Sequence, residues 1–169
     1  FPADVVNGIE KEGDVFYHKY GWPNSKHVIH CVGYDFRTYA KRELGDLALS
    51  PEIARDLLAK LYERLLMETA KSGPSTLRLV PVSAGIFAGP LLGDMPAITA
   101  EALLDASAAC FASSKMVGAK AEKDVFADYA AHATVELCVY LERDFARYEA
   151  AWKAAVSKRV ATDSTRSQK

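Results

Sequence analysis

Apolar runs alternate with helical patterns along the chain. Residues 28–32, 76–82 and 134–141 are short runs with few polar interruptions, a pattern typical of strands buried on both faces of a sheet. A weaker run at 14–24 predicts a brief strand that ends at turn residues. The first apolar run, residues 4–7, ends at Asn7.

Helical spacing is clearest between residues 51 and 70, where apolar side chains recur every three or four positions. Ser50 is a suitable cap and Pro51 suits the first helical position, while Gly73 gives a stop signal. The alanine-rich stretch 97–111 predicts a deeply packed helix. Further helix is expected at 124–133 and at 142–158, with a polar loop at 113–124; the last helix places an apolar stripe at Phe145, Tyr148, Trp152 and Val156.

Buried strands interleaved with helices predict an α/β fold with helices on both faces of a mainly parallel sheet. The length of 169 residues fits one domain, which we assign to residues 1–157, followed by a polar tail at 158–169 that is expected to fray. In such sheets ligands bind beyond the carboxyl ends of the strands. The loop that begins at Ser83 lies at such an end.

Composition narrows the classes of partner. The net charge is −1, so no strong field favours nucleic acid or an anionic membrane, and no stretch reaches the roughly twenty apolar residues of a membrane span. Cys31, Cys110 and Cys138 lie in apolar stretches without zinc-like spacing and are interpreted as reduced core thiols of an intracellular protein, cytoplasmic or nuclear. His27 and His30 lie three positions apart in a strand, so their side chains face opposite sides and cannot share a metal ion. No metal site is predicted, and no cofactor is predicted.

The loop at 83–87 is the main candidate for chemistry. Ser83, Ala84 and Gly85 are small enough for a ligand to approach the backbone, and consecutive free amides can form a concavity for an anion. Phe87 could cover a ribose or a base. Ser83 lacks the glycine context of a nucleophile elbow. The alternative is a tight turn without a ligand, and Asp35 and Arg37 either reach the crevice or face solvent.

This loop, Ser-Ala-Gly-Ile-Phe-Ala-Gly-Pro at 83–90, resembles the Ser-Thr-Gly-Ile-aromatic-Gly-aromatic-Pro loop of macro domains. The stretch 22–33, Trp-Pro-Asn-Ser-Lys-His-Val-Ile-His-Cys-Val-Gly, is similar to that family's Leu-Pro-x-Lys-x-Val-Ile-His-x-Val-Gly segment. Residues 2–7 resemble its first strand, which ends in Asn, and residues 135–150 its last strand and helix. The resemblance covers nearly the whole chain in order.

The resemblance implies a three-layer α/β/α sandwich that binds ADP-ribose or ADP-ribosylated protein and, in some members, hydrolyses ADP-ribosyl groups or deacetylates O-acetyl-ADP-ribose. It places Ser83, Ala84, Gly85, Ile86 and Phe87 around the distal phosphate and ribose, and Asn7 at the first Asn of an Asn-Ala-Ala-Asn element. The chain departs from the family at Glu10, which replaces the second Asn, and it has no Gly-Gly-Gly loop there. The alternative is a degenerate macro-fold module that serves protein interaction. Catalytic residues, substrate and oligomeric state are not assigned.

Overall fold

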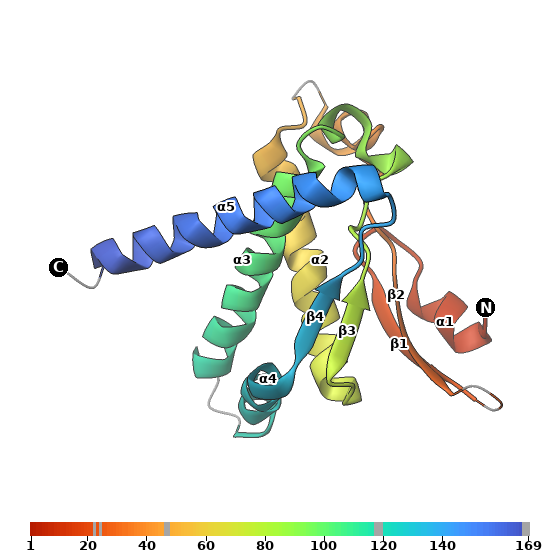
Figure 1. Ribbon diagram of the computed structural model, residues 1–169. Coiled ribbons are helices and arrows are strands. Elements are labelled where there is room, and N and C mark those ends of the chain that lie inside the picture. The colour runs from red at the N-terminus through yellow and green to blue at the C-terminus, as the bar shows by residue number, and fades with distance from the viewer. Residues whose placement is uncertain (22, 24, 46–47, 117–119, 167–169) are drawn as a thin grey trace.

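The computed structural model describes residues 1–21, 23, 25–45, 48–116 and 120–166. It is a mixed α/β fold in which long helices pack beside short strands (Figure 1). The elements in chain order are α1 Ala3–Gly8, β1 Val15–Tyr20, β2 Lys26–Cys31, η1 Ala40–Leu44, α2 Pro51–Ser72, β3 Thr76–Leu79, η2 Ile86–Leu91, α3 Met95–Met116, α4 Lys120–His132, β4 Thr134–Leu137 and α5 Glu142–Arg166. Trp22 and Asn24 of the macro-like stretch, and residues 167–169 of the predicted tail, lie outside the described residues.

The strands pair two by two. β1 and β2 form an antiparallel hairpin in which Val15 lies opposite Cys31, whereas β3 and β4 run parallel with Thr76 opposite Thr134. The predicted α/β class is confirmed. A mainly parallel arrangement holds for β3 and β4 but is wrong for β2, because a tight connection to β1 enforces the antiparallel direction.

Residues 3–8 form a helix rather than the strand that the resemblance implies. Pro2 precedes the helix, and Asp4 stands in its first turn, where a negative charge is favourable. The Asp4 carboxylate also contacts His18 Nδ1 of β1 at 2.8 Å, and Phe1 packs edge-on against His30 of β2. These contacts hold α1 on one face of the hairpin, while Ile29 on the other face packs against the core.

Helix α2 is the centre of the core and agrees with its prediction. The Ser50 hydroxyl accepts a hydrogen bond from Ile53 N–H at 3.4 Å, Pro51 begins the helix, and Gly73 ends it with a φ of +89°. Its buried face packs against α3 and the strands. The largest fully buried side chains of the fold are Tyr62, Phe36, Leu58, Leu61, Met95, Val5, Thr69, Thr99 and Cys110.

Helix α3 is long and apolar, and it is buried as predicted at Ile98, Ala102 and Ala106. Contrary to the expectation that no segment has the length of a membrane span, its residues 95–112 pass that test by length and hydropathy. Half of this window is buried inside the protein, and α2 and α5 pack on it. A buried core helix of this length meets the same criterion.

The polar stretch expected to be a loop is largely helical: residues 113–116 belong to α3 and 120–124 to α4, and 117–119 lie outside the described residues. The predicted tail is helical as well, because α5 continues to Arg166. Lys158 Nζ lies 3.1 Å from a carboxylate oxygen of Glu101, and Arg159 pairs with Asp105. These ion pairs fasten the polar end of α5 to α3.

The cysteines differ in environment. Cys110 is buried, and burial raises the pKa of its thiol to about 12; Cys31 is half-buried, and burial raises the pKa of its thiol as well. Cys138 is exposed. The prediction of core thiols is therefore right for Cys110 and wrong for Cys138, which stands just beyond the short strand β4.

The two sheets meet at one end and separate at the other. The carboxyl ends of β2 and β3 converge, since Tyr34 N–H donates to Ser83 Oγ at 2.8 Å. Further back, a cavity of about 580 Å³ opens between the two strands, and Leu65 and Thr69 of α2 line it. Within the described residues, β2 and β3 are not paired as strands.

Candidate functional site

The loop after β3 is fastened to the segment after β2. Ser83 Oγ accepts from Tyr34 N–H, and the carbonyl oxygen of Phe87 accepts from Phe36 N–H at 2.9 Å. Ser83 is buried, with 9% of its surface exposed, so its hydroxyl joins the two segments. The loop therefore lies beyond the carboxyl ends of β2 and β3, where the sequence places it.

Close backbone approaches shape this loop. A Cβ atom at Gly33 would lie 2.7 Å from Ser83 Oγ, and one at Gly89 would lie 2.9 Å from Arg37 Cα. Gly89 also has a φ of +55°, which favours glycine, and Ser83 itself is held at +60°. A left-handed residue other than glycine persists only where its surroundings fix it. The contacts with residues 33–37 provide that constraint.

Three consecutive residues of the loop, Gly85, Ile86 and Phe87, are exposed to solvent. The first hydrogen bond of η2 runs from Ala88 N–H to the carbonyl of Gly85 at 3.1 Å, so the amides of Gly85, Ile86 and Phe87 precede the bonded turn. No atom lies within 4 Å of the Cβ position that Gly85 lacks, and Ile86 is 74% exposed. Ala84 packs partly buried on the core. The backbone of the loop is thus accessible at Gly85, and we call residues 83–87 together with Asp35 and Arg37 the rim.

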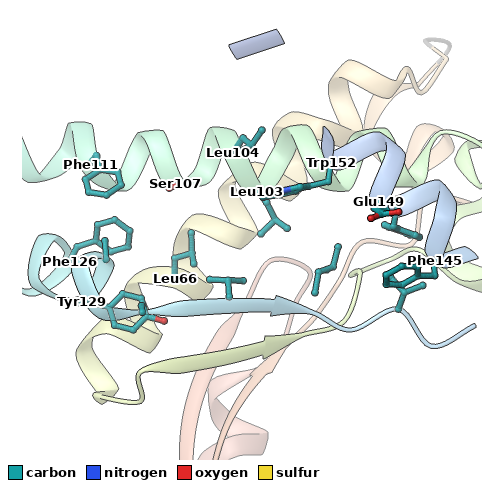
Figure 2. A pocket seen from close by; sticks show the side chains of 16 residues that line it. Leu66, Leu103, Leu104, Ser107, Phe111, Phe126, Tyr129, Phe145, Glu149 and Trp152 are labelled. Carbon is teal, nitrogen blue, oxygen red and sulfur yellow. The ribbon is translucent and has the colours of Figure 1, made fainter. Parts of the chain in front are cut away.

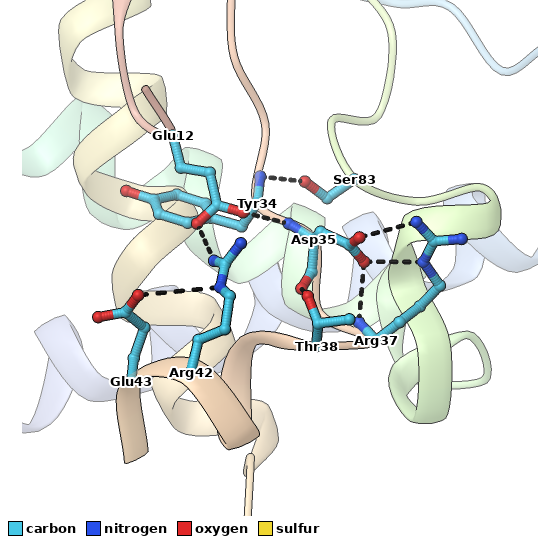
Figure 3. Close-up of polar contacts among 8 residues, drawn as sticks. All are labelled: Glu12, Tyr34, Asp35, Arg37, Thr38, Arg42, Glu43 and Ser83. Carbon is cyan, nitrogen blue, oxygen red and sulfur yellow. Dashed lines mark hydrogen bonds and ion pairs between the residues drawn. The ribbon is translucent and has the colours of Figure 1, made fainter. Parts of the chain in front are cut away.

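An aromatic ring and a cation lie beside these amides. Phe87 is 46% exposed, and the Arg37 guanidinium carbon stands 4.9 Å from its ring centroid. Two nitrogens of Arg37 donate to the Asp35 carboxylate at 2.8 and 2.7 Å (Figure 3). These hydrogen bonds lower the pKa of Asp35 and raise that of Arg37. The sequence left open whether Asp35 and Arg37 reach the crevice or face solvent. In the structure Arg37 lies over the ring of Phe87 and binds Asp35, so both residues belong to the rim.

A second ionic group supports the same segment. Glu12 accepts from Asp35 N–H at 2.8 Å and pairs with Arg42, which also lies 3.8 Å from Glu43 (Figure 3). The hydrogen bond and charge of Glu12 raise the pKa of Arg42. Sequence reasoning did not identify Glu12, because nothing in the local pattern places residue 12 beside residue 35. Its role is to hold the backbone of the 34–37 turn.

Asn7 is not brought to this loop. It lies near the end of α1, which packs on β1, and no hydrogen bond or ion pair between the described residues joins it to residues 83–87. The helical conformation of residues 3–8 removes the strand end at which the resemblance places Asn7. The structure thus assembles Ser83, Ala84, Gly85, Ile86 and Phe87, but leaves Asn7 elsewhere.

The histidines have structural partners. His27 Nδ1 lies 2.6 Å from Tyr17 Oη, and His30 Nε2 lies 3.1 Å from Tyr20 Oη. Burial lowers the pKa of His30. Among the residues that the structure describes, no three His, Cys, Asp or Glu side chains are grouped to hold a metal ion.

Tyr62 holds the segment that connects β3 to the loop. Its side chain is fully buried, and its hydroxyl accepts from Val82 N–H at 3.2 Å. Burial raises the pKa of this hydroxyl, so it stays neutral at physiological pH.

We expect Tyr62→Phe to lower the free energy of unfolding by about 1–3 kcal/mol, because the buried Val82 amide loses its partner. Urea unfolding followed by circular dichroism measures the change. Tyr140→Phe is the control, since Tyr140 is 95% exposed and its change should lie within about 0.5 kcal/mol. Equal stabilities of the two variants would show that the Val82 contact contributes nothing.

Comparison with known proteins adds no assignment. No family model, curated protein or solved structure matches the chain. The resemblance to macro domains therefore rests only on the sequence motifs quoted above. The geometry of the loop at residues 83–87 is the remaining basis for a functional proposal.

Proposed function

We propose that the chain binds ADP-ribose, free or attached to a protein, at residues 83–87. The observation that carries this proposal is the exposed run Gly85, Ile86 and Phe87, whose amides precede the first hydrogen-bonded turn of η2, together with the exposed ring of Phe87. Consecutive backbone N–H groups that face one concavity are suited to phosphate oxygens. An exposed ring beside them offers a surface for the sugar.

Each residue of the loop has a distinct role in this proposal. The amides of Gly85 and Ile86 donate to the pyrophosphate, and Gly85 lets the ligand approach the backbone. Phe87 packs on the distal ribose, and the Arg37 guanidinium, paired with Asp35, lies over the ring of Phe87. Ser83 and Ala84 hold the loop in place through the contacts described above. The proposal assigns binding alone, and no residue is given a catalytic role.

We also propose that the two sheets belong to a three-layer α/β/α sandwich. Three observations support this arrangement: the carboxyl ends of β2 and β3 meet, α1 covers one face of the β1–β2 hairpin, and α2 lies on the other. Figure 1 shows the two strand pairs beside each other, with α2 behind β3 and β4 and α3 to the left of β4.

Isothermal titration calorimetry with ADP-ribose tests the proposed binding. We expect a saturable signal and, at a hundredfold excess of ligand over Kd, stabilisation by about 2.7 kcal/mol in a parallel unfolding experiment. Ribose without phosphates is the matched ligand control and should give no signal, because the amides recognise the pyrophosphate. Absence of heat and of stabilisation at millimolar ADP-ribose would remove the proposal.

A second candidate function is a macro-like interaction module that lacks ADP-ribose binding. It is favoured by Glu10, which stands where the family has its second Asn, and by a large apolar cavity on another side of the molecule. The titration separates the two functions. A folded protein that ignores ADP-ribose supports the interaction module.

A further inference from the structure

Among the described residues, strand β4 has a partner strand on one edge only. Its amides at Thr134 and Cys138 donate to the carbonyls of Ser75 and Leu79 at 2.8 and 2.7 Å, which directs these alternate residues toward β3. The N–H and C=O groups of the intervening residues, including Val135 and Leu137, therefore face away from β3. In the described part of the chain no strand lies there.

A cavity of about 550 Å³ lies beside this edge. Val135, Leu137 and Val139 of the β4 segment line it from alternate positions, and Leu103 of α3 lines the opposite side. Figure 2 shows the space between β4 and α3, with α4 at one end and α5 at the other. Side chains at alternate positions of a strand share one face. A strand added next to β4 would direct its own alternate side chains into the same cavity.

The cavity carries the surface features of a binding site. Val135 is 42% exposed, Trp152 41% and Phe145 58%, so large apolar side chains surround its mouth. Contiguous exposed apolar groups mark interaction sites in many proteins. Tyr129 lines the cavity, and its hydroxyl is a buried polar atom without a hydrogen-bond partner among the described residues.

The shape of the edge favours a free peptide over a second copy of the chain. α4 ends two residues before β4 begins, and α5 starts at Glu142, so a helix flanks each end of the strand. Antiparallel pairing of two β4 strands would bring α4 of one copy against α5 of the other. A single extended segment avoids this collision. A small apolar molecule would fill the cavity but leave the edge amides unused.

We propose that the free edge of β4 binds an extended segment of a partner protein, apolar at alternate positions, by strand addition. The backbone of that segment pairs with Val135 and Leu137, and its apolar side chains enter the cavity. Strand addition of this kind combines main-chain hydrogen bonds with pockets for alternate side chains. This site is separate from the ADP-ribose loop and does not depend on it.

The probe is an acetylated, amidated heptapeptide of alternating valine and threonine with a lysine at each end. We expect saturable binding by isothermal titration calorimetry and at least about tenfold weaker binding to Val135→Lys, because a charge at an edge blocks strand pairing. Val160→Lys is the matched control, since Val160 is 61% exposed on α5 and does not line the cavity.

Three outcomes would overturn the proposal. The first is absence of saturable binding to the wild type. The second is equal affinity for a peptide that is N-methylated at the amides facing β4, which would indicate apolar adsorption without backbone pairing. The third is a wild-type dimer in sedimentation that Val135→Lys dissociates, which would make a second copy the occupant. ADP-ribose affinity should be the same for Val135→Lys and wild type, so failure of either proposal is recognised separately.

Discussion

Phe36→Ala is expected to lower the free energy of unfolding by about 3–5 kcal/mol. Phe36 is 1% exposed, its ring stacks on Tyr34 at a centroid distance of 6.0 Å, and it packs against the main core. Truncation removes buried apolar surface and leaves a cavity that the surrounding helices cannot fully close. A loss of this size is a large part of the stability of a domain of this length.

Urea unfolding followed by circular dichroism and by tryptophan fluorescence measures this effect. Phe145→Ala is the matched control: the same side chain is deleted where it is 58% exposed, so we expect a loss below about 1 kcal/mol. Similar losses for the two variants would mean that Phe36 is not a core residue. The position of residues 34–37 relative to the loop would then need revision.

Gly85→Glu is expected to weaken ADP-ribose binding by about a hundredfold or more, equal to about 2.7 kcal/mol. The glycine has open space around it, so the new side chain fits without unfolding the loop. It adds a carboxylate where the proposal places the pyrophosphate, and like charges repel. Its bulk also prevents the close approach of ligand to backbone.

The control is Gly21→Glu, which introduces the same charge at another glycine with no atom within 4 Å of its missing Cβ. We expect Gly21→Glu to bind ADP-ribose with wild-type affinity in calorimetry, and both variants to keep the wild-type circular dichroism spectrum. A folded Gly85→Glu protein with unchanged affinity would show that the ligand binds elsewhere.

The features that could be predicted from the sequence are those that local chemistry determines. The cap at Ser50, the first-turn proline and the glycine stop define α2 without reference to the rest of the chain. The same is true of the loop at Ser83, because a short apolar run followed by small residues predicts a strand end. ADP-ribose binding stays a prediction.

The features that sequence reasoning missed depend on partners distant in the chain. The apolar run at residues 4–7 is compatible with a strand, and its contacts with His18 and Phe16 stabilise it as α1. The polar end of α5 has no strong helical signal of its own, and its ion pairs with Glu101 and Asp105 form only once α3 is folded. The placement of Arg37 over Phe87 likewise requires the fold of both loops.

The hydrogen bond from Tyr34 N–H to Ser83 Oγ connects the end of the β1–β2 hairpin to the loop after β3. The hairpin is held to β3 at that point, while the far parts of β2 and β3 stand apart across the cavity that Leu65 and Thr69 line. The hydrogen bond between Phe36 N–H and the Phe87 carbonyl adds a second connection, two residues beyond Tyr34 and four beyond Ser83, so the loop at Gly85 is tied to the end of the hairpin although β2 and β3 are not paired as strands in the described part of the chain.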